Sequence, residues 1–428
     1  MRAMITLMMG VTMSTIGQAS AAGAEWREEV QRLTGQIAPD VVQWRRDFHA
    51  HPELSNREER TARVVAEQLR AMGVDDVRTD VARHGVVALI RGRRPGRTVA
   101  LRADMDALPI EEETGLPFAS QNARVMHACG HDAHTAILLG AAKVLVAMRE
   151  HIPGSVKLLF QPAEEGPPAG EEGGAKLMIQ EGALENPPVA AIFGLHINPE
   201  LESGKVSYRF GGMMAAVDRI RIVVTGKQSH GGMPWQGVDP VVASAHIITA
   251  LQAIPARHID ARQPVVISIG VVRAEGAWNI IPDQVELLGT VRTLDPEIRR
   301  QVAEQFHRTV RQTAAAHGTK AEIAYGDYGP VLLNDATLGA QAVKTLQRAI
   351  GSENVGETRP LMGGEDFAHY ALKTPGFFFF LGVRNEQIGA VHALHTPQMV
   401  LDEAALPLGV RAMAMLALDY LAHNQASE

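Results

Sequence analysis

VKLLFQPAEE, residues 156–165, joins a short, largely apolar run to two adjacent acids, Glu164 and Glu165. Such a run, bounded by a proline turn, is typical of a buried strand. The acids then lie at the strand's C-terminal end, where open α/β sheets carry their ligand sites. We therefore predict a strand that carries two acidic site residues. Taken alone, the pair also suits a solvated acidic turn.

Strand-like and helix-like stretches alternate on both sides of this segment. Further strands are predicted at 86–90, 98–101, 190–195 and 376–382. Helices are predicted at 133–148, 175–180, 337–350 and 403–423, and two more between 25 and 69. This alternation predicts an α/β domain with a mostly parallel sheet covered by helices.

The pattern changes in the middle of the chain. Strands of the exposed type are expected at 219–225, 265–272 and 284–290, with helices at 241–254 and 296–317. This order suits a small α+β sandwich with helices on one sheet face. The 428 residues exceed the roughly 250–300 at which a single core stops growing. We therefore predict a catalytic domain formed by 25–208 and 322–428, interrupted by an inserted domain at 209–321.

Residues 1–24 have the features of a signal peptide. Arg2 precedes an uncharged stretch, and small residues at 19–24 fit a cleavage site. The predicted location is the periplasm or the outside of the cell, and the alternative is an incorrectly assigned start or a frayed extension. No later stretch has about 18 consecutive apolar residues, so no membrane span is expected after signal removal. The net charge of -7 and scattered basic pairs argue against a nucleic-acid partner.

The densest group of metal-binding residue types is HACGHDAH, residues 127–134, which contains the one cysteine of the chain, Cys129. Zinc-like ions take thiolate and imidazole ligands at ~2.0–2.3 Å. Alone, the cluster also suits a structural cysteine among histidines that cap a helix. His196, after a predicted strand, and His395, near the C-terminus, are further candidate donors. Their occurrence together favours a metal site.

RADMD, residues 102–106, closes another short predicted strand and adds two acids to the same region. Asp106 suits the role of a partner for the second nitrogen of a metal-bound imidazole, because ligating histidines usually donate that N–H to an oxygen. The role of Asp104 stays open, and either acid can instead cap the following turn.

The motifs RADMDALPI, HACGHDAHTA, FQPAEEG, GLH, MGGEDF and HTP occur in this order along most of the chain. In this combination the sequence resembles the aminoacylase, hippurate hydrolase and indoleacetyl-amino-acid hydrolase branch of the dinuclear metallopeptidases. The resemblance implies that Glu164 is the general acid/base. It also implies two divalent metal ions (Zn, Mn, Co or Ni) held by Cys129, His131, Glu165, His196 and His395.

The same resemblance assigns roles to the inserted domain, which mediates a homodimer in the family. His230 in QSHGG matches a histidine that reaches the partner's active site and steadies the oxyanion. Asn279 in WNIIP and Arg292 in GTVR match residues that bind the substrate carboxylate, and Gly363 and Gly364 match a loop that lines the site. Without the resemblance, His230 also suits a turn and Arg292 a surface ion pair.

The predicted function is hydrolysis of an N-acyl amino acid, of the hippurate or N-acetyl type, to a carboxylic acid and a free amino acid. A dipeptidase or carboxypeptidase of the same mechanism is an alternative. More distant alternatives are a hydrolase with Cys129 as nucleophile, activated by His127 or His131, and an exported binding protein without turnover. After Glu165 the chain reads GPPAGEEGGAK, longer than the usual glycine run of the family, so a loop insertion is expected there.

Overall fold

The computed structural model describes residues 10–424 and divides the chain into two compact units. The large unit contains Met1–Tyr208, Asp335–Glu357 and Lys373–Glu428, and the small unit contains Arg209–Asn334 and Thr358–Leu372. The predicted signal peptide lies partly outside the described residues, and its remaining part belongs to the first helix, α1 (Gly10–Ala50).

The large unit is built on an eight-stranded sheet in the order β1-β2-β4-β3-β5-β16-β6-β15. Its four central strands run parallel to one another: β4 (Pro153–Gln161), β3 (Arg94–Asp104), β5 (Val189–Glu202) and β16 (Gly376–Arg384). The outer strands are β1 (Asp76–Val81), β2 (Gly85–Arg91), β6 (Val206–Tyr208) and β15 (Val355–Glu357). β2 and β6 run antiparallel to β4 and β16, and β1 runs antiparallel to β2. The other four of the seven strand pairings are parallel, so the predicted mostly parallel sheet is confirmed. The polar edge strand β1 was not predicted, because few of its side chains are apolar.

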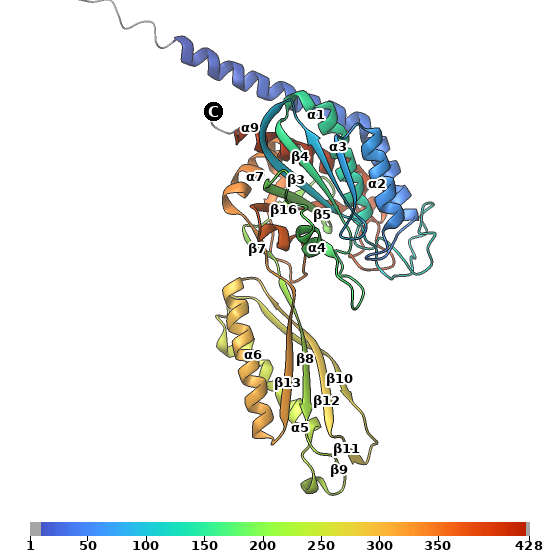
Figure 1. The fold of residues 1–428 in the computed structure, drawn as a ribbon, viewed down its shortest axis with the longest axis vertical. Coiled ribbons are helices and arrows are strands. Elements are labelled where there is room, and N and C mark those ends of the chain that lie inside the picture. The colour runs from blue at the N-terminus through green and yellow to red at the C-terminus, as the bar shows by residue number, and fades with distance from the viewer. Residues whose placement is uncertain (1–9, 425–428) are drawn as a thin grey trace, which may run out of the picture. The chain divides into compact units, whose positions relative to one another are not determined.

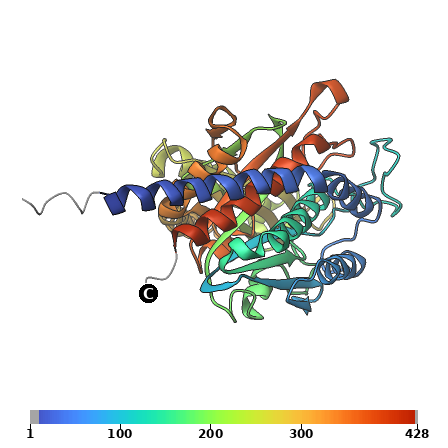
Figure 2. The same cartoon turned by 90° about the horizontal axis from the view of Figure 1, so that it is seen from above.

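Three helices of the large unit lie side by side and contact one another (Figure 2): α1, α3 (His131–Ala147) and α9 (Leu406–His423). Smaller helices are α2 (Glu59–Ala71), α4 (Gly174–Gln180) and α7 (Ala336–Ile350). Nearly every residue of α3 is buried, because this helix contacts both the sheet and its two neighbours. Within the described part of the chain, one stretch, Glu403–His423, has the length and hydropathy of a membrane span, and 78% of its most apolar window is buried within the protein.

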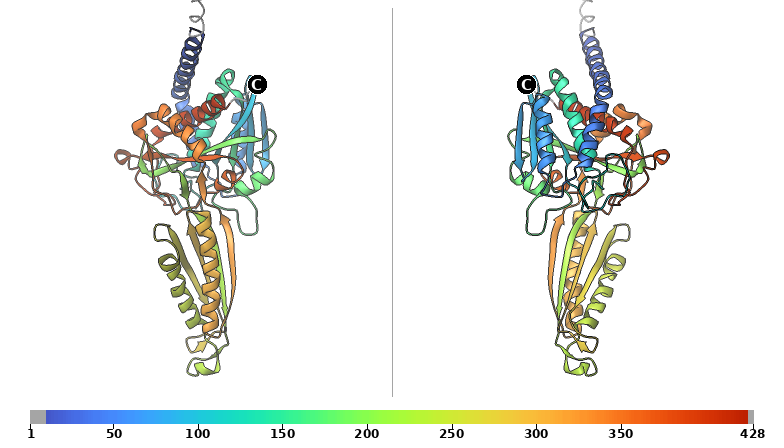
Figure 3. Two further views of the ribbon diagram at one scale, coloured as in Figure 1. Left: turned by 90° about the vertical axis from the view of Figure 1, so that its left-hand side faces the viewer. Right: turned by 90° about the vertical axis from the view of Figure 1, so that its right-hand side faces the viewer.

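The small unit has an antiparallel sheet in the order β10-β12-β8-β13, with α5 (Pro240–Leu251) and α6 (Pro296–Ala316) on one face (Figures 1 and 3). Its strands are β8 (Ala216–Thr225), β10 (Val265–Ala274), β12 (Gln284–Thr293) and β13 (Lys320–Gly329). Asp239 and Asp295 cap the two helices, each followed by a proline that suits the first helical position. Inward side chains of the strands and helices form one apolar core.

The small unit extends beyond the inserted domain predicted at 209–321. β13 pairs with β8 along its length, so it continues the small sheet and does not begin the large unit at residue 322. β14 (Leu332–Asn334) pairs with β7 (Gly211–Met214), and the segment Thr358–Leu372, which contains α8 (Ala368–Ala371), also belongs to the small unit. The sequence does not reveal this arrangement, because strand pairing between distant segments leaves no local pattern.

Candidate metal centre

The candidate donors of the large unit gather near the C-terminal ends of its parallel strands. Glu165 lies just after β4, and His196 lies in β5, level with Phe380 of the neighbouring strand β16. Cys129 and His131 stand at the beginning of α3, and His395 follows β16 in the chain. Chain segments distant in sequence therefore supply one cluster. It lies at the end of the sheet where the parallel strands terminate, which is where α/β folds place their sites.

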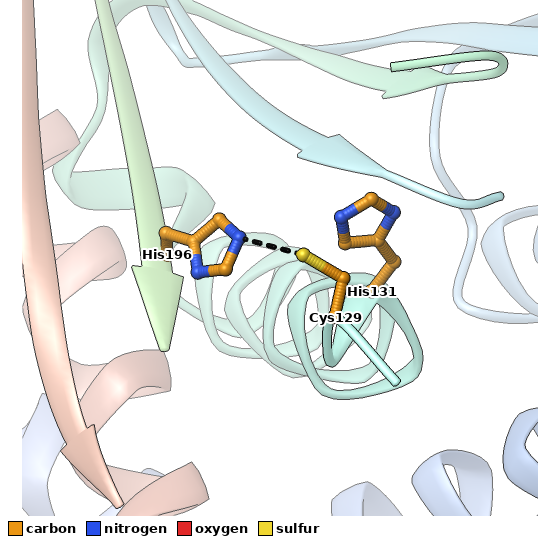
Figure 4. Close-up of side chains that lie close together, drawn as sticks. All are labelled: Cys129, His131 and His196. Atoms are coloured by element: carbon orange, nitrogen blue, oxygen red, sulfur yellow. Dashed lines mark hydrogen bonds between the residues drawn. The ribbon is translucent and has the colours of Figure 1, made fainter. Parts of the chain in front are cut away.

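Cys129 Sγ belongs to two sets of donor atoms. It lies 3.3 Å from His196 Nε2 and 3.2 Å from His395 Nε2. Figure 4 shows its side chain between the rings of His131 and His196. The donor atoms of Cys129, His131 and His196 lie within 4.8 Å of one another, and so do those of Cys129, Glu165 and His395. A sulfur shared by two sets could serve as a common ligand of two ions.

The turn between Cys129 and His131 requires a glycine. Gly130 has a φ of 87°, in the left-handed region that glycine adopts without a Cβ clash. A Cβ at this position would also lie 2.3 Å from Ile197 Cδ1. The glycine thus lets the thiol and the first imidazole of α3 approach β5 closely.

The two buried histidines of the donor set, His131 and His196, both direct Nε2 toward the cluster. His131 Nδ1 lies 3.2 Å from Asp106 Oδ1, and its buried Nε2 has no hydrogen-bond partner in the described part of the chain. His196 Nδ1 lies 2.6 Å from the carbonyl oxygen of Ile197, so this nitrogen donates and Nε2 faces Cys129. Ligating histidines are commonly oriented in this way by a bond from the other ring nitrogen.

The carboxylates around the cluster favour the protonated forms of its donors when no cation is bound. Burial, together with the carboxylates of Glu165 and Glu164, raises the pKa of the Cys129 thiol well above its usual range. Burial alone would lower the pKa of His131, but Asp104 and Asp106 raise it to about 10. A divalent cation reverses this situation, because it stabilises a thiolate and a neutral imidazole. The donor set therefore fits metal ions.

A nucleophilic role for Cys129 does not fit its surroundings. Reactive cysteines have a lowered pKa and partial exposure. Cys129 is only 6% exposed, and its pKa is raised. His127, the suggested activating base, is itself buried, and burial lowers its pKa to about 4.

Asp106 organises the neighbourhood of the donors. Its carboxylate accepts hydrogen bonds from the backbone N–H groups of Glu164 (3.1 Å) and Glu165 (3.0 Å) and from Ser55 Oγ (2.7 Å), besides its contact with His131. Asp106 therefore lies where a partner for a metal-bound imidazole is needed.

Asp104, whose role the sequence left open, contacts a histidine outside the proposed donor set. Its closest histidine is His134, with Nδ1 2.6 Å from Asp104 Oδ1, and it also accepts from Arg102 at 2.6 Å. His134 Nε2 in turn accepts the backbone N–H of Ile197 at 2.9 Å. Asp104 thus holds the backbone beside His196 through His134, whereas His131 Nε2 lies 3.9 Å away from it. The spacing of His131 and His134 on one helix face is the signal that could have revealed this role.

Glu164 lies at the edge of the cluster. Its Oε2 is 3.9 Å from His131 Nε2, and its side chain is 10% exposed. A carboxylate at this distance reaches the donor site and retains access to solvent, which a group that moves protons needs.

The remaining predicted site residues lie on the small unit and form two groups. His230 in β9 (Ser229–His230) pairs with Ile280 of β11 (Ile280–Ile281), and Gly231 N donates to Asn279 O at 2.7 Å. Arg292 Nη1 donates to the carbonyl oxygen of Met362 at 3.0 Å, beside Gly363 and Gly364.

These two groups lie at opposite ends of the small sheet. The β9–β11 ribbon continues from the end of β12 at Gln284, and Arg292 stands eight positions further along β12 (Figure 1). At ~3.4 Å per residue this is about 27 Å. The structure therefore does not bring Asn279 and Arg292 together within one copy of the small unit.

The fold and the cluster define an α/β metalloprotein with sulfur, nitrogen and oxygen donors at one end of a parallel sheet. The family model described as Peptidase family M20/M25/M40 matches residues 100–419. The chain belongs to this family.

Similar proteins span nearly the whole chain. Thermostable carboxypeptidase 1 of Saccharolobus solfataricus is 41% identical over 394 residues, which cover 92% of this chain and 98% of that protein. The N-acyl-L-amino acid amidohydrolase of Geobacillus stearothermophilus is 43% identical over 327 residues, 75% of this chain and 86% of its own. A crystal structure from Bacillus subtilis, described as a dinuclear metal binding peptidase from the M20 family, has a TM-score of 0.79 and 37% identity, and covers 91% of this chain and 99% of that one.

Proposed function

We propose that the chain is a metal-dependent amidohydrolase that cleaves the amide bond of an N-acyl amino acid to give a carboxylic acid and a free amino acid. The observation that carries the proposal is the Cys129 sulfur shared by two donor sets, with a further carboxylate, Glu164, beside them. The similarity to an N-acyl-L-amino acid amidohydrolase supports this reaction.

Two divalent ions per chain are part of the proposal, and zinc, manganese, cobalt and nickel all suit the donors. Cys129, His131 and His196 would hold one ion, and Cys129, Glu165 and His395 the other. The similar dinuclear structure from Bacillus subtilis supports this number. When bound, such ions polarise a carbonyl oxygen and lower the pKa of coordinated water toward ~7.

Glu164 moves the proton in the proposed reaction. One of its carboxylate oxygens takes a proton from the water that attacks the amide carbonyl carbon. The same oxygen returns this proton to the amide nitrogen as the C–N bond breaks. The water oxygen stays with the acyl group, so the products are the acid and the free amine.

We further propose that two copies of the chain form a homodimer through the small unit and that His230 of one copy acts in the site of the other. The separation of His230 and Asn279 from Arg292 supports this, because one amino-acid substrate cannot contact groups about 27 Å apart. Exposed apolar side chains supply a surface for a partner: Trp235 (76% exposed), Val272 (57%) and Trp278 (97%). Exposed apolar side chains of this size are typical of surfaces that bind another protein.

The Arg292 guanidinium is proposed to bind the substrate carboxylate. Arginine pairs with carboxylates in a planar, two-bond geometry. Arg292 is half-buried, and within the described part of the chain its one polar contact is the carbonyl oxygen of Met362, so donor groups remain for an anion.

A carboxypeptidase or dipeptidase is the second candidate. The 41% identity to a thermostable carboxypeptidase favours it. The same residues serve both reactions, because a peptide bond is also an amide whose departing amine carries a carboxylate. The difference lies in the acyl side of the substrate.

Hydrolysis assays with protein purified without chelator test the proposal. Hippurate, N-acetyl and longer N-acyl amino acids, and dipeptides are compared by amine release, before and after metal removal and re-addition. We expect amine release that stops on chelation and returns with a divalent ion. Amine release that survives complete metal removal contradicts the ligand assignment, and no turnover with any substrate favours a binding protein.

Export is proposed from the N-terminal sequence. Fractionation of producing cells and N-terminal sequencing of the mature protein test it. We expect a mature chain that begins near residues 21–25 in the exported fraction. An uncleaved N-terminus in the cytoplasmic fraction contradicts the proposal.

A further inference from the structure

A buried glutamate outside the predicted site contacts the turn that carries Glu164 and Glu165. Glu58 lies between α1 and α2, and its side chain is fully buried. Its Oε1 accepts hydrogen bonds from the backbone N–H groups of Ala163 (2.8 Å) and Asn56 (3.0 Å). One oxygen atom therefore joins the α1–α2 connection to the turn after β4.

Both residues bonded to this oxygen have an unusual backbone conformation. Ala163 has a φ of 54° and Asn56 a φ of 60°, in the left-handed region. Residues with a Cβ rarely adopt this conformation, and it persists only where the surrounding contacts enforce it. Asparagine tolerates it better than alanine does, so Ala163 depends more on external contacts.

The position of Ala163 makes its conformation important. It directly precedes Glu164, so a change in its backbone angles would redirect the Glu164 and Glu165 carboxylates. Asp106 accepts the next two backbone N–H groups, those of Glu164 and Glu165. Two buried side chains, Glu58 and Asp106, thus hold three consecutive N–H groups of this turn.

Within residues 10–424, the hydrogen bonds of the Glu58 carboxylate to other residues are those from Ala163 and Asn56. Asp106 also contacts His131 and Ser55, whereas Glu58 Oε2 has no hydrogen-bond partner among residues 10–424. Burial and the nearby charge of Asp106 raise the pKa of Glu58 to about 8. A raised pKa favours the uncharged carboxyl group, and the contact that the structure shows is made by one acceptor oxygen, Oε1.

We propose that Glu58 is a positioning residue, which holds the left-handed turn at Ala163 and so directs Glu164 and Glu165 toward the donor cluster. This inference rests on the proposed function for the role of Glu164 and on the proposed metal site for that of Glu165.

Two substitutions separate positioning from a role as an acid. Glu58→Gln keeps the reach and an acceptor oxygen but removes the acid, whereas Glu58→Asp keeps the acid but is too short to reach Ala163. Titration with Co²⁺, followed by the thiolate absorption of Cys129, measures metal affinity without any substrate. Turnover of the best N-acyl amino acid supplies kcat and KM separately.

We expect Glu58→Asp to lose ~10–100-fold in Co²⁺ affinity and in kcat, as changes behind a ligand shell do, with KM near the wild-type value. Glu58→Gln should stay near wild type in all three quantities. In an Ala163→Gly background the loss caused by Glu58→Asp should shrink, because glycine adopts the left-handed conformation without a side-chain clash.

Equal losses in Glu58→Gln and Glu58→Asp overturn the proposal, as do losses that Ala163→Gly leaves unchanged. If Glu58→Asp does not fold, the comparison of Glu58→Gln with wild type still decides, since a large loss in a folded Gln variant contradicts positioning. A wild-type chain that binds Co²⁺ but hydrolyses no N-acyl amino acid refutes the proposed function and leaves the metal-affinity test of Glu58 intact.

Discussion

The two units hold their candidate functional residues in different ways. In the large unit, Cys129, His131 and His196 are buried, and other residues of the chain orient both histidines. In the small unit, His230 and Asn279 are exposed. A buried polar group left unpaired costs about 1–3 kcal/mol of stability. The buried histidines of the large unit therefore need hydrogen-bond partners from the same chain, and these partners also orient them. Exposed side chains are solvated, and they can serve a second molecule.

The largest effect is expected at Glu164, on the large-unit side of this comparison. Glu164→Gln should reduce kcat by up to ~10⁴-fold, because positioned acid–base groups contribute ~10²–10⁴. Both metal ions should remain, since Glu164 is not proposed as a ligand. Metal analysis beside kcat checks this, with Glu165→Gln as the matched control that loses metal. Loss of metal from Glu164→Gln would instead make Glu164 a ligand.

His230→Ala is expected to reduce kcat by ~10²–10³-fold, the usual effect of losing one oxyanion donor. The exposed position predicts that the thermal midpoint and the metal content stay unchanged. Unchanged turnover would remove His230 from the site.

Mixing the two inactive variants sharpens the comparison. If His230 acts in the partner's site, a dimer of one Glu164→Gln chain and one His230→Ala chain has one complete site. Random exchange of subunits should then restore about a quarter of wild-type activity, since half of the dimers are mixed. Equal mixtures that stay inactive after confirmed exchange contradict a site shared between copies.

The smallest effect concerns stability and pH in the two units. Burial alone would raise the pKa of Asp419 in the large unit, but its bonds to Arg348 and Thr345 and the charge of Arg348 lower it. A lowered pKa stabilises the folded chain above the unfolded value of about 3.9, and this contribution is lost as pH falls through the folded value.

Asp419→Asn should therefore reduce the free energy of unfolding by ~1–3 kcal/mol at neutral pH, and by less below about pH 4. Asp260→Asn in the small unit, which removes an exposed pair with Arg262, should change stability little. Urea unfolding at several pH values measures both. Equal effects, or a difference that grows toward low pH, would contradict this account.

The predicted elements follow local patterns that the structure retains. The helix at 133–148 and the strand at 156–160 correspond to α3 and β4, because apolar periodicity records which face is buried. The sequence assigned most of β13 to the large unit, which was wrong. Membership of a sheet depends on a partner strand far away in the sequence, here β8. The sequence left the role of Asp104 open, and the structure shows that its carboxylate contacts His134.

The sequence by itself determined the types of donor and the family, because thiol, imidazole and carboxylate groups in ordered motifs constrain the chemistry whatever their distances. Only the tertiary structure decided that Cys129 lies between two donor sets, that Glu58 holds the turn before Glu164, and that Arg292 and Asn279 lie at opposite ends of one sheet. These are contacts or separations between segments far apart in the chain. Side-chain packing and strand register determine them, and a local sequence pattern predicts neither.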